Sequence, residues 1–350
     1  MRTLSLLTAL ALVLALTGCA TQEPPIPVDT AQIKPPEIAG YELMKVPANN
    51  PMTQAKVDLG KVLYYDKRLS ADGARSCYGC HLKENGLTDG KPTAIGAFEA
   101  KLPRSSPTMW NIGLHSEFYW DGRAKSLEAQ VRAAWTLGNM GVSGKEKNRP
   151  SVEEVTAKIN AIPGYKPLFQ KAYGGPATPD NIVQAVACFV RTIVSPANTK
   201  WLRFRSGEAA AFSEEAQRGW KVFSEKAKCT NCHDGLLLTD QQYHNTGIGM
   251  DAEKPDVGRF VVTKDEKDTG AFKTPTLLDI SKSAPYFHNG SVATLEESVD
   301  GMVNGGKKNK FLDTKNLKPV KLSAAEKSDL LAFLRSLDVD YTVTEPPLPQ

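Results

Sequence analysis

The sequence contains Cys77-Tyr78-Gly79-Cys80-His81 and, 152 residues later, Cys229-Thr230-Asn231-Cys232-His233. Both stretches have the spacing C-x-x-C-H, in which two thiols bind the two vinyl groups of one haem and the following histidine lies under the iron. A single copy could instead be a redox dithiol or half of a zinc site. Two copies that both end in histidine predict two covalently bound haem c groups. The predicted attachment thiols and proximal ligands are Cys77, Cys80 and His81 for the first haem and Cys229, Cys232 and His233 for the second.

The N-terminus has the features of an export signal. A short positive start, Met1-Arg2, precedes an apolar run from Leu4 to Leu16 that is too short to span a bilayer comfortably. The run ends in Leu16-Thr17-Gly18-Cys19, which resembles the lipobox of bacterial lipoproteins, where the cysteine receives a lipid after cleavage. An ordinary signal peptide with a chance cysteine is the alternative. We therefore expect a periplasmic protein anchored by a lipid on Cys19, and Ala20 favours the outer membrane.

The composition is that of a folded globular protein. The chain has 350 residues, of which 41% are hydrophobic and 23% charged, which disfavours a disordered chain, a collagen and a multi-span membrane protein. The net charge of +4 is too small and too dispersed to indicate nucleic-acid binding. The length allows two domains that each bury a core.

Helical patterns flank both cysteine motifs. We expect helices over residues 52–65 and 212–226, a third that begins at Thr178-Pro179 and a fourth that begins at Ser323. Gly60 and Gly219 each lie four residues before an aromatic residue, a pattern that permits close crossing with another helix. No period-2 pattern indicates strands. The predicted fold is mainly α, with two cytochrome c-like haem domains and long loops.

An internal repeat relates the two halves at a constant offset of 168 residues. The matching segments are Pro107-Thr108 with Pro275-Thr276, Tyr119-Trp120-Asp121-Gly122 with Phe287-His288-Asn289-Gly290, and Ser126-Leu127-Glu128 with Thr294-Leu295-Glu296. In this register Met302 corresponds to Ala134. A thioether is a good sixth ligand for haem iron, whereas alanine cannot bind it. The second haem is therefore predicted to be six-coordinate, through His233 and Met302, and the first to be open; a core methionine is the alternative reading of Met302.

These features divide the chain into five parts. Residues 1–18 are predicted to be a lipoprotein signal peptide and residues 19–43 a proline-rich tether. Residues 44–205 form the domain of the open haem and residues 206–341 the domain of the electron-transfer haem. Residues 342–350 are a tail.

Several other side chains carry weaker signals. His115 could reach the first haem but is more commonly a surface or outer-layer residue, and His244 lies in a polar loop. Trp120 and His288 match in the repeat and could both lie between the haems. Trp120 could act as a redox relay that passes electrons between the two haems, or it could simply be a packed aromatic ring. Cys188 is interpreted as a buried, inert thiol.

These motifs together resemble the bacterial di-haem cytochrome c peroxidase family, which includes the methylamine dehydrogenase maturation enzyme. The likeness runs from about Met52 to Leu337. The shared segments include Leu69-Ser70, Pro103-Arg104, Trp120-Asp121-Gly122-Arg123-Ala124, Phe272-Lys273-Thr274-Pro275-Thr276 and Pro285-Tyr286-Phe287-His288. The resemblance implies that the N-terminal haem is peroxidatic and that the C-terminal haem accepts electrons from a small cytochrome or copper protein. It also implies that Trp120 lies between the haems and that Gln130 lines the peroxide pocket.

The chain departs from the family pattern at three positions. Ala97 stands where the peroxidases place a histidine that caps the peroxidatic haem, so the first haem is expected to be permanently open. Asn139 stands where the family has a glutamate that moves the peroxide proton, and an amide can orient peroxide but cannot titrate. Ser105 replaces an asparagine that binds an interdomain calcium ion in the family. Backbone carbonyls near Ser283 and Pro285 could still hold calcium.

Three functions remain open from the sequence. The favoured one is a peroxidase that reduces hydrogen peroxide to water, with Gln130, Trp120 and Asn139 as its catalytic residues. The second is a maturation oxidase that modifies Trp or Tyr residues of a partner protein, and the third is a plain electron-transfer module. The preference for the first comes from the family resemblance.

Overall fold

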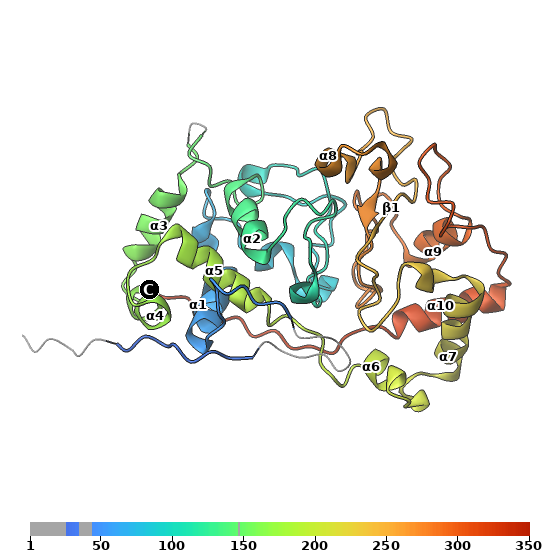
Figure 1. Ribbon diagram of the computed structural model, residues 1–350, viewed down its shortest axis with the longest axis horizontal. Helices are drawn as coiled ribbons and strands as arrows, with labels where there is room; N and C mark the ends of the chain where they lie inside the picture. Colours follow the sequence, from blue (N-terminus) through green and yellow to red (C-terminus); the bar gives the residue numbers. More distant parts are fainter. Residues whose placement is uncertain (1–25, 35–43, 146–147) are drawn as a thin grey trace, which may run out of the picture.

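The computed structural model describes residues 26–34, 44–145 and 148–350 and has a mainly helical fold with long loops (Figure 1), which confirms the predicted fold class. The predicted signal peptide and Cys19 lie outside the described residues. The helices of the first half are α1 (Gln54–Tyr65), α2 (Leu127–Thr136), α3 (Val152–Asn160), α4 (Tyr165–Tyr173) and α5 (Pro179–Val190). The helices that follow are α6 (Lys200–Arg205), just before the predicted boundary, and α7 (Glu214–Lys221), α8 (Phe260–Thr263), α9 (Leu295–Val303) and α10 (Ala324–Arg335) in the second half.

Short segments complete the secondary structure. Turns of 3-10 helix are η1 (Lys67–Leu69), η2 (Tyr78–Cys80), η3 (Lys83–Asn85), η4 (Ala97–Glu99), η5 (Ile112–Leu114), η6 (Ala209–Ala211), η8 (Cys229–Asn231) and η9 (Glu266–Asp268). The strands β1 (Tyr243–His244) and β2 (Phe272–Lys273) form an antiparallel pair in which Tyr243 lies opposite Lys273.

The predicted helix starts are present, with their capping residues. The side chains of Thr53, Thr178 and Ser213 each accept a hydrogen bond from a backbone N–H of the first turn, and Ser323 forms a capping box with Glu326. The helix expected over residues 212–226 is divided. Its first part is α7, and its second part, η7 (Val222–Lys226), is a π-helical turn.

Each half contains one close crossing of two helices. Helix α1 packs on α5, and α7 packs on α10. A Cβ atom on Gly60 would lie 1.9 Å from the carbonyl oxygen of Ala185, and a Cβ atom on Gly219 would lie 1.9 Å from that of Asp329. Only glycine allows the backbones to approach so closely. The structure therefore confirms the role predicted for both glycines.

The two halves repeat one course of backbone. Helices α2 and α9 begin at Ser126 and Thr294, which are 168 residues apart. Isolated antiparallel bridges join Phe118 to Ala124 and Tyr286 to Val292, again at that offset. The left-handed φ values also match, 68° at Tyr119 and 69° at Phe287, and 58° at Asn111 and 56° at Asp279. Non-glycine residues rarely adopt this conformation, so its repetition at matched positions indicates one architecture used twice.

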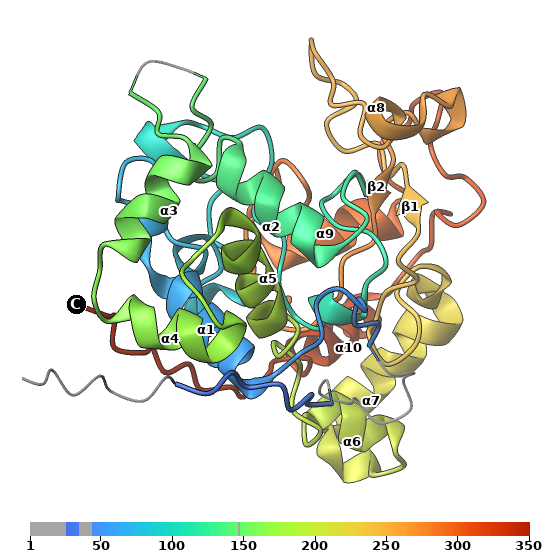
Figure 2. The same cartoon turned by 60° about the vertical axis from the view of Figure 1, so that its left-hand side comes forward.

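Backbone hydrogen bonds join the two halves. The Ser105 N–H donates to the His288 carbonyl over 2.8 Å, and the Lys273 N–H donates to the Trp120 carbonyl over 2.8 Å. The C-terminal segment runs back along the first half (Figures 1 and 2), where the guanidinium of Arg68 donates to the Pro349 carbonyl. The final residues therefore pack against the first half of the protein.

The crossing of α7 and α10 leads to a stability prediction. Replacing Gly219 with Ala forces two backbones apart, and we expect the free energy of unfolding to fall by about 3 kcal/mol. Gly301→Ala is the matched control, because Gly301 lies in α9 with nothing within 4 Å of its would-be Cβ atom. Alanine there should leave stability unchanged or raise it by up to about 1 kcal/mol. Denaturant unfolding monitored by circular dichroism measures the free energy of unfolding of both variants. Equal values for Gly219→Ala and Gly301→Ala would contradict this account.

Candidate haem sites and the interdomain pocket

The first candidate haem site comprises Cys77, Cys80 and His81, and the turn η2 positions all three. Cys77 precedes the turn, Cys80 ends it and His81 follows directly. Nδ1 of His81 lies 3.0 Å from the carbonyl oxygen of Leu87. This hydrogen bond orients the ring and leaves Nε2 free to bind a metal. Burial lowers the pKa of His81, which favours the neutral imidazole that binds iron.

The second candidate haem site, which comprises Cys229, Cys232 and His233, has the same arrangement. Nδ1 of His233 lies 3.0 Å from the Leu238 carbonyl oxygen, and burial lowers its pKa as well. All three residues line a largely apolar cavity of about 220 Å³, together with Met302 from α9. Around this one apolar cavity, two thiols that could attach the vinyl groups and an imidazole and a thioether that could bind iron fit the needs of haem c.

The turn η4 and the loop that follows α2 bring together two of the three departures from the family pattern, Ala97 and Asn139. The Ala97 N–H donates to the Asn139 carbonyl over 2.9 Å, and Ala97 is fully buried. The loop that carries Ala97 is further tied by Arg75 Nε, which donates to the Gly96 carbonyl, and by the Phe98 N–H, which donates to the Asp72 carboxylate. This segment is held from both sides and carries no imidazole. Gln130 and Ala134 lie one turn apart on the half-buried face of neighbouring α2.

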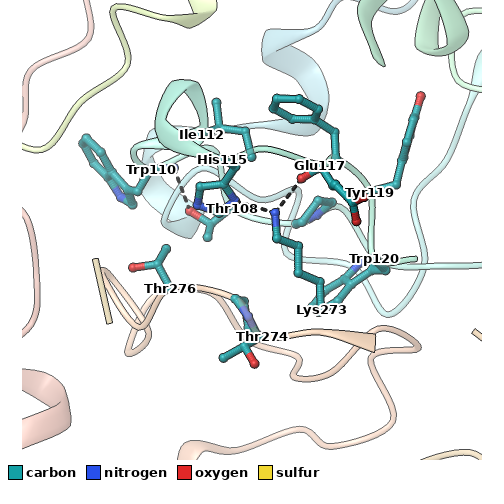
Figure 3. Close-up of a pocket in the computed structure, with 13 residues that line it drawn as sticks. Thr108, Trp110, Ile112, His115, Glu117, Tyr119, Trp120, Lys273, Thr274 and Thr276 are labelled. Atoms are coloured by element: carbon teal, nitrogen blue, oxygen red, sulfur yellow. Dashed lines mark hydrogen bonds between the residues drawn. The ribbon is translucent and has the colours of Figure 1, made fainter. Parts of the chain in front are cut away.

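Trp120 lies where the two halves meet. Its indole N–H donates to the Ser105 carbonyl over 3.0 Å, and its own carbonyl accepts from the Lys273 N–H. Its side chain lines the cavity of the second haem site and also a smaller pocket of about 40 Å³ between the halves, which we call the interdomain pocket (Figure 3).

The interdomain pocket contains a pair of residues that sequence reasoning did not bring together. Nζ of Lys273 lies 2.9 Å from Nδ1 of His115 and donates to the Glu117 carbonyl over 2.5 Å. The sequence presents Lys273 only as part of a motif and His115 as a residue that could reach the first haem or lie in an outer layer; in the structure His115 lines this pocket instead. The two are 158 residues apart, and no local pattern signals their contact.

Charged residues also cross between the halves. The guanidinium of Arg104 binds the Asp121 carboxylate at 2.7 Å and the Asp256 carboxylate at 2.6 Å. The hydroxyl of Ser105 donates to the Phe287 carbonyl over 2.9 Å. This bond joins the halves directly at the position where the family has a calcium-binding asparagine, and calcium binding here stays a prediction.

The remaining histidines and the helix thiol have structural partners. His244 contacts the carboxylates of Asp240 and Asp313, and although burial opposes the charged form, these hydrogen bonds raise its pKa. The ring of His288 stacks on Phe272 with 3.6 Å between centroids. Cys188 is fully buried in α5, and burial raises the pKa of its thiol to about 11, which agrees with an inert thiol.

Residues 54–210 match the family model described as "Di-haem cytochrome c peroxidase". The chain is 37% identical over 308 residues to "Methylamine utilization protein MauG" of Methylorubrum extorquens, covering 87% of this chain and 84% of that protein. It is 36% identical over 341 residues to "Cytochrome-c peroxidase IdrP1" of Denitromonas iodatirespirans, covering 89% and 88%. The chain belongs to the di-haem cytochrome c peroxidase family. It is therefore an oxidoreductase of the cytochrome c peroxidase type, and the family implies two haem c groups.

Solved structures agree with this assignment. A "MauG-like protein associated with microbial copper homeostasis" superposes with a TM-score of 0.76 and 31% sequence identity, covering 92% of this chain and 95% of that chain. The di-haem peroxidase BthA of Burkholderia thailandensis superposes with a TM-score of 0.67 over 90% of this chain, and at 18% identity it supports the fold alone. Within the described residues, no helix is long and apolar enough to cross a membrane.

The contrast between the two sites predicts different spin states. With haem bound, the first site should be high-spin in the ferric protein at rest, because its flanking loop is fixed and Ala97 offers no ligand atom. The second site should be low-spin, and Met302→Ala should convert it to high-spin. Electron paramagnetic resonance at low temperature measures both signals. Two low-spin haems in the unaltered protein would show that another residue caps the first iron.

Proposed function

We propose that this protein reduces hydrogen peroxide to water with electrons from a small cytochrome or copper protein. The observation that carries the proposal is the difference between two otherwise repeated sites. Met302 lines the same cavity as His233, whereas its counterpart Ala134 has no atom that can bind iron. One site is thus built to hold iron on both faces, and the other leaves a face open for peroxide.

Particular side chains would perform each part of this reaction. Haem c would supply an iron that changes oxidation state, held by His81 at the first site and by His233 with Met302 at the second. Gln130, from α2, would hold peroxide by hydrogen bonds from its amide. Asn139 would add a second amide but cannot take up or release a proton, so protons must come from solvent rather than from this side chain.

A specific observation favours a second function, the oxidation of a partner protein. The chain is similar to two proteins named "Methylamine utilization protein MauG", at 37% and 35% identity. In addition, the loop around Ala97 is tied on both sides and carries no histidine that could cap the first haem and then move away on reduction. In that reaction the electrons would come from Trp or Tyr residues of a partner protein, which would be oxidised while peroxide is reduced.

Turnover with a reduced small cytochrome distinguishes the two functions. We expect peroxide-dependent oxidation of the cytochrome, and we expect Asn139→Glu to raise the rate by about 10²-fold, because it restores a proton-transfer group. Asn139→Gln is the matched control, since it lengthens the side chain without adding a titratable group. Negligible cytochrome oxidation by a protein whose haem spectra still respond to peroxide would favour the partner-oxidising function. An unchanged rate in Asn139→Glu would remove the missing base as the limit on turnover.

The proposal places the protein in the periplasm with a lipid on Cys19, on the basis of the N-terminal sequence alone. A labelled fatty acid fed to the cells should enter the protein, and Cys19→Ser should abolish labelling and release the protein from membranes. Cys188→Ser is the matched control, because the buried thiol is inaccessible. Labelling that persists in Cys19→Ser would contradict the lipid anchor.

A further inference from the structure

The interdomain pocket encloses an amine that is buried without an acidic hydrogen-bond partner. Lys273 is 7% exposed, and its two acceptors in the described chain, His115 Nδ1 and the Glu117 carbonyl, are both uncharged (Figure 3). A buried ammonium normally needs a carboxylate beside it. The arrangement therefore favours loss of the proton at a lower pH than is usual for lysine.

The neighbouring charges do not supply the missing partner. The Glu117 carboxylate is bound by Lys125, Arg259 and the Tyr243 hydroxyl, and although burial opposes the charge, these bonds lower its pKa to about 2. The Asp121 carboxylate is bound by Arg104 and Arg123. Burial lowers the pKa of Lys273 to about 8; Glu117 opposes this change and Arg259 adds to it.

His115 is suited to hold the amine in either charge state. Burial, and then the adjacent Lys273, lower the pKa of His115 well below its usual value, so the ring is neutral. Its Nδ1 accepts from the ammonium, which places the ring proton on Nε2. That Nε2 is buried without a partner among the described residues, and the pocket of about 40 Å³ is large enough to hold water.

The pocket lies on the route between the two haem sites. Pro107 and Pro275, the repeat-related residues whose carbonyls interact with His81 and His233, both line it. Trp120 lines it as well and accepts a backbone hydrogen bond from Lys273. An indole that passes electrons between the sites loses one electron to the first site and regains one from the second. Its N–H proton stays in place, because the Ser105 carbonyl is too weak a base to remove it.

We infer that the amine of Lys273, held by His115, is a charge switch that controls electron flow past Trp120 between the two haem sites. The inference rests on the proposed function, in which each peroxide takes up two electrons and two protons to form two waters. An ammonium in the pocket that the indole lines opposes the positive charge of the oxidised ring, whereas the neutral amine does not. Electron transfer should therefore be slower below the pKa of Lys273 and faster above it.

The first test needs no peroxide. The reduction potentials of both haems in the holoprotein are measured between pH 6 and 10 by spectroelectrochemistry, for the unaltered protein, Lys273→Gln and the exposed control Lys264→Gln. At pH 6 the Lys273 charge should hold the potentials above those of Lys273→Gln, and this difference should disappear through an inflection near pH 8. Lys264→Gln should follow the unaltered protein. The switch is overturned if the difference is absent at every pH, or if it persists unchanged to pH 10.

The second test measures the electron transfer itself. The second haem is reduced, peroxide is added, and its reoxidation is followed by stopped-flow absorbance. We expect about a tenfold faster reoxidation at pH 9.5 than at pH 6.5, and a fast, pH-independent rate in Lys273→Gln. His115→Leu removes an acceptor that stabilises the ammonium, so the inflection should move below that of the unaltered protein. A pH profile that survives in Lys273→Gln overturns the inference.

The two tests separate this inference from the proposed function. If the potentials switch as expected but peroxide leaves the haems unchanged, the peroxidase proposal fails and the switch stands. If turnover with the cytochrome is normal but the potentials of Lys273→Gln match those of the unaltered protein at all pH values, only the switch fails.

Discussion

The two candidate haem sites depend first on how His81 and His233 are held. In both halves a backbone carbonyl, of Leu87 or of Leu238, accepts from Nδ1 and turns Nε2 toward the site. The carbonyl belongs to the loop that follows the C-x-x-C-H turn, so the course of that loop fixes the ring. Each C-x-x-C-H turn lies against a helix of its own half, η2 against α1 and η8 against η7, which continues α7. The two glycine crossings fix α1 on α5 and α7 on α10 by letting their backbones come into contact.

Because the scaffold is repeated so closely, the proposed difference in function between the halves rests on few side chains. Helices α2 and α9 begin at equivalent residues, yet one carries Ala134 where the other carries Met302. On the first half, the loop at Ala97 and the loop at Asn139 are tied to each other by their backbones. Under the proposed function, the lack of an imidazole at Ala97 and of a carboxylate at Asn139 would change the chemistry of the first site while leaving the fold that supports it unchanged.

The sequence predicted those features that have local signals. Helix starts at Thr53 and Ser323 follow from side chains that bond to the next turn, and the crossings at Gly60 and Gly219 follow from a short spacing pattern. The end of α7 was less predictable, because α-helical and π-helical turns share one hydrophobic pattern over so few residues. The pairing of His115 with Lys273 had no local signal at all, since it arises only when two halves dock.

That docking also explains why one amine differs from its neighbours. Arg104 lies between Asp121 and Asp256, and Glu117 is neutralised by Lys125 and Arg259. These pairs satisfy the charges that the joined surfaces would otherwise leave buried. Lys273 alone among these residues is bonded to uncharged acceptors, because β2 directs its side chain into a pocket whose walls are mainly aromatic rings, prolines and threonines. The contact that joins the halves thereby isolates one titratable group beside Trp120, where its charge acts on the route that links the two sites.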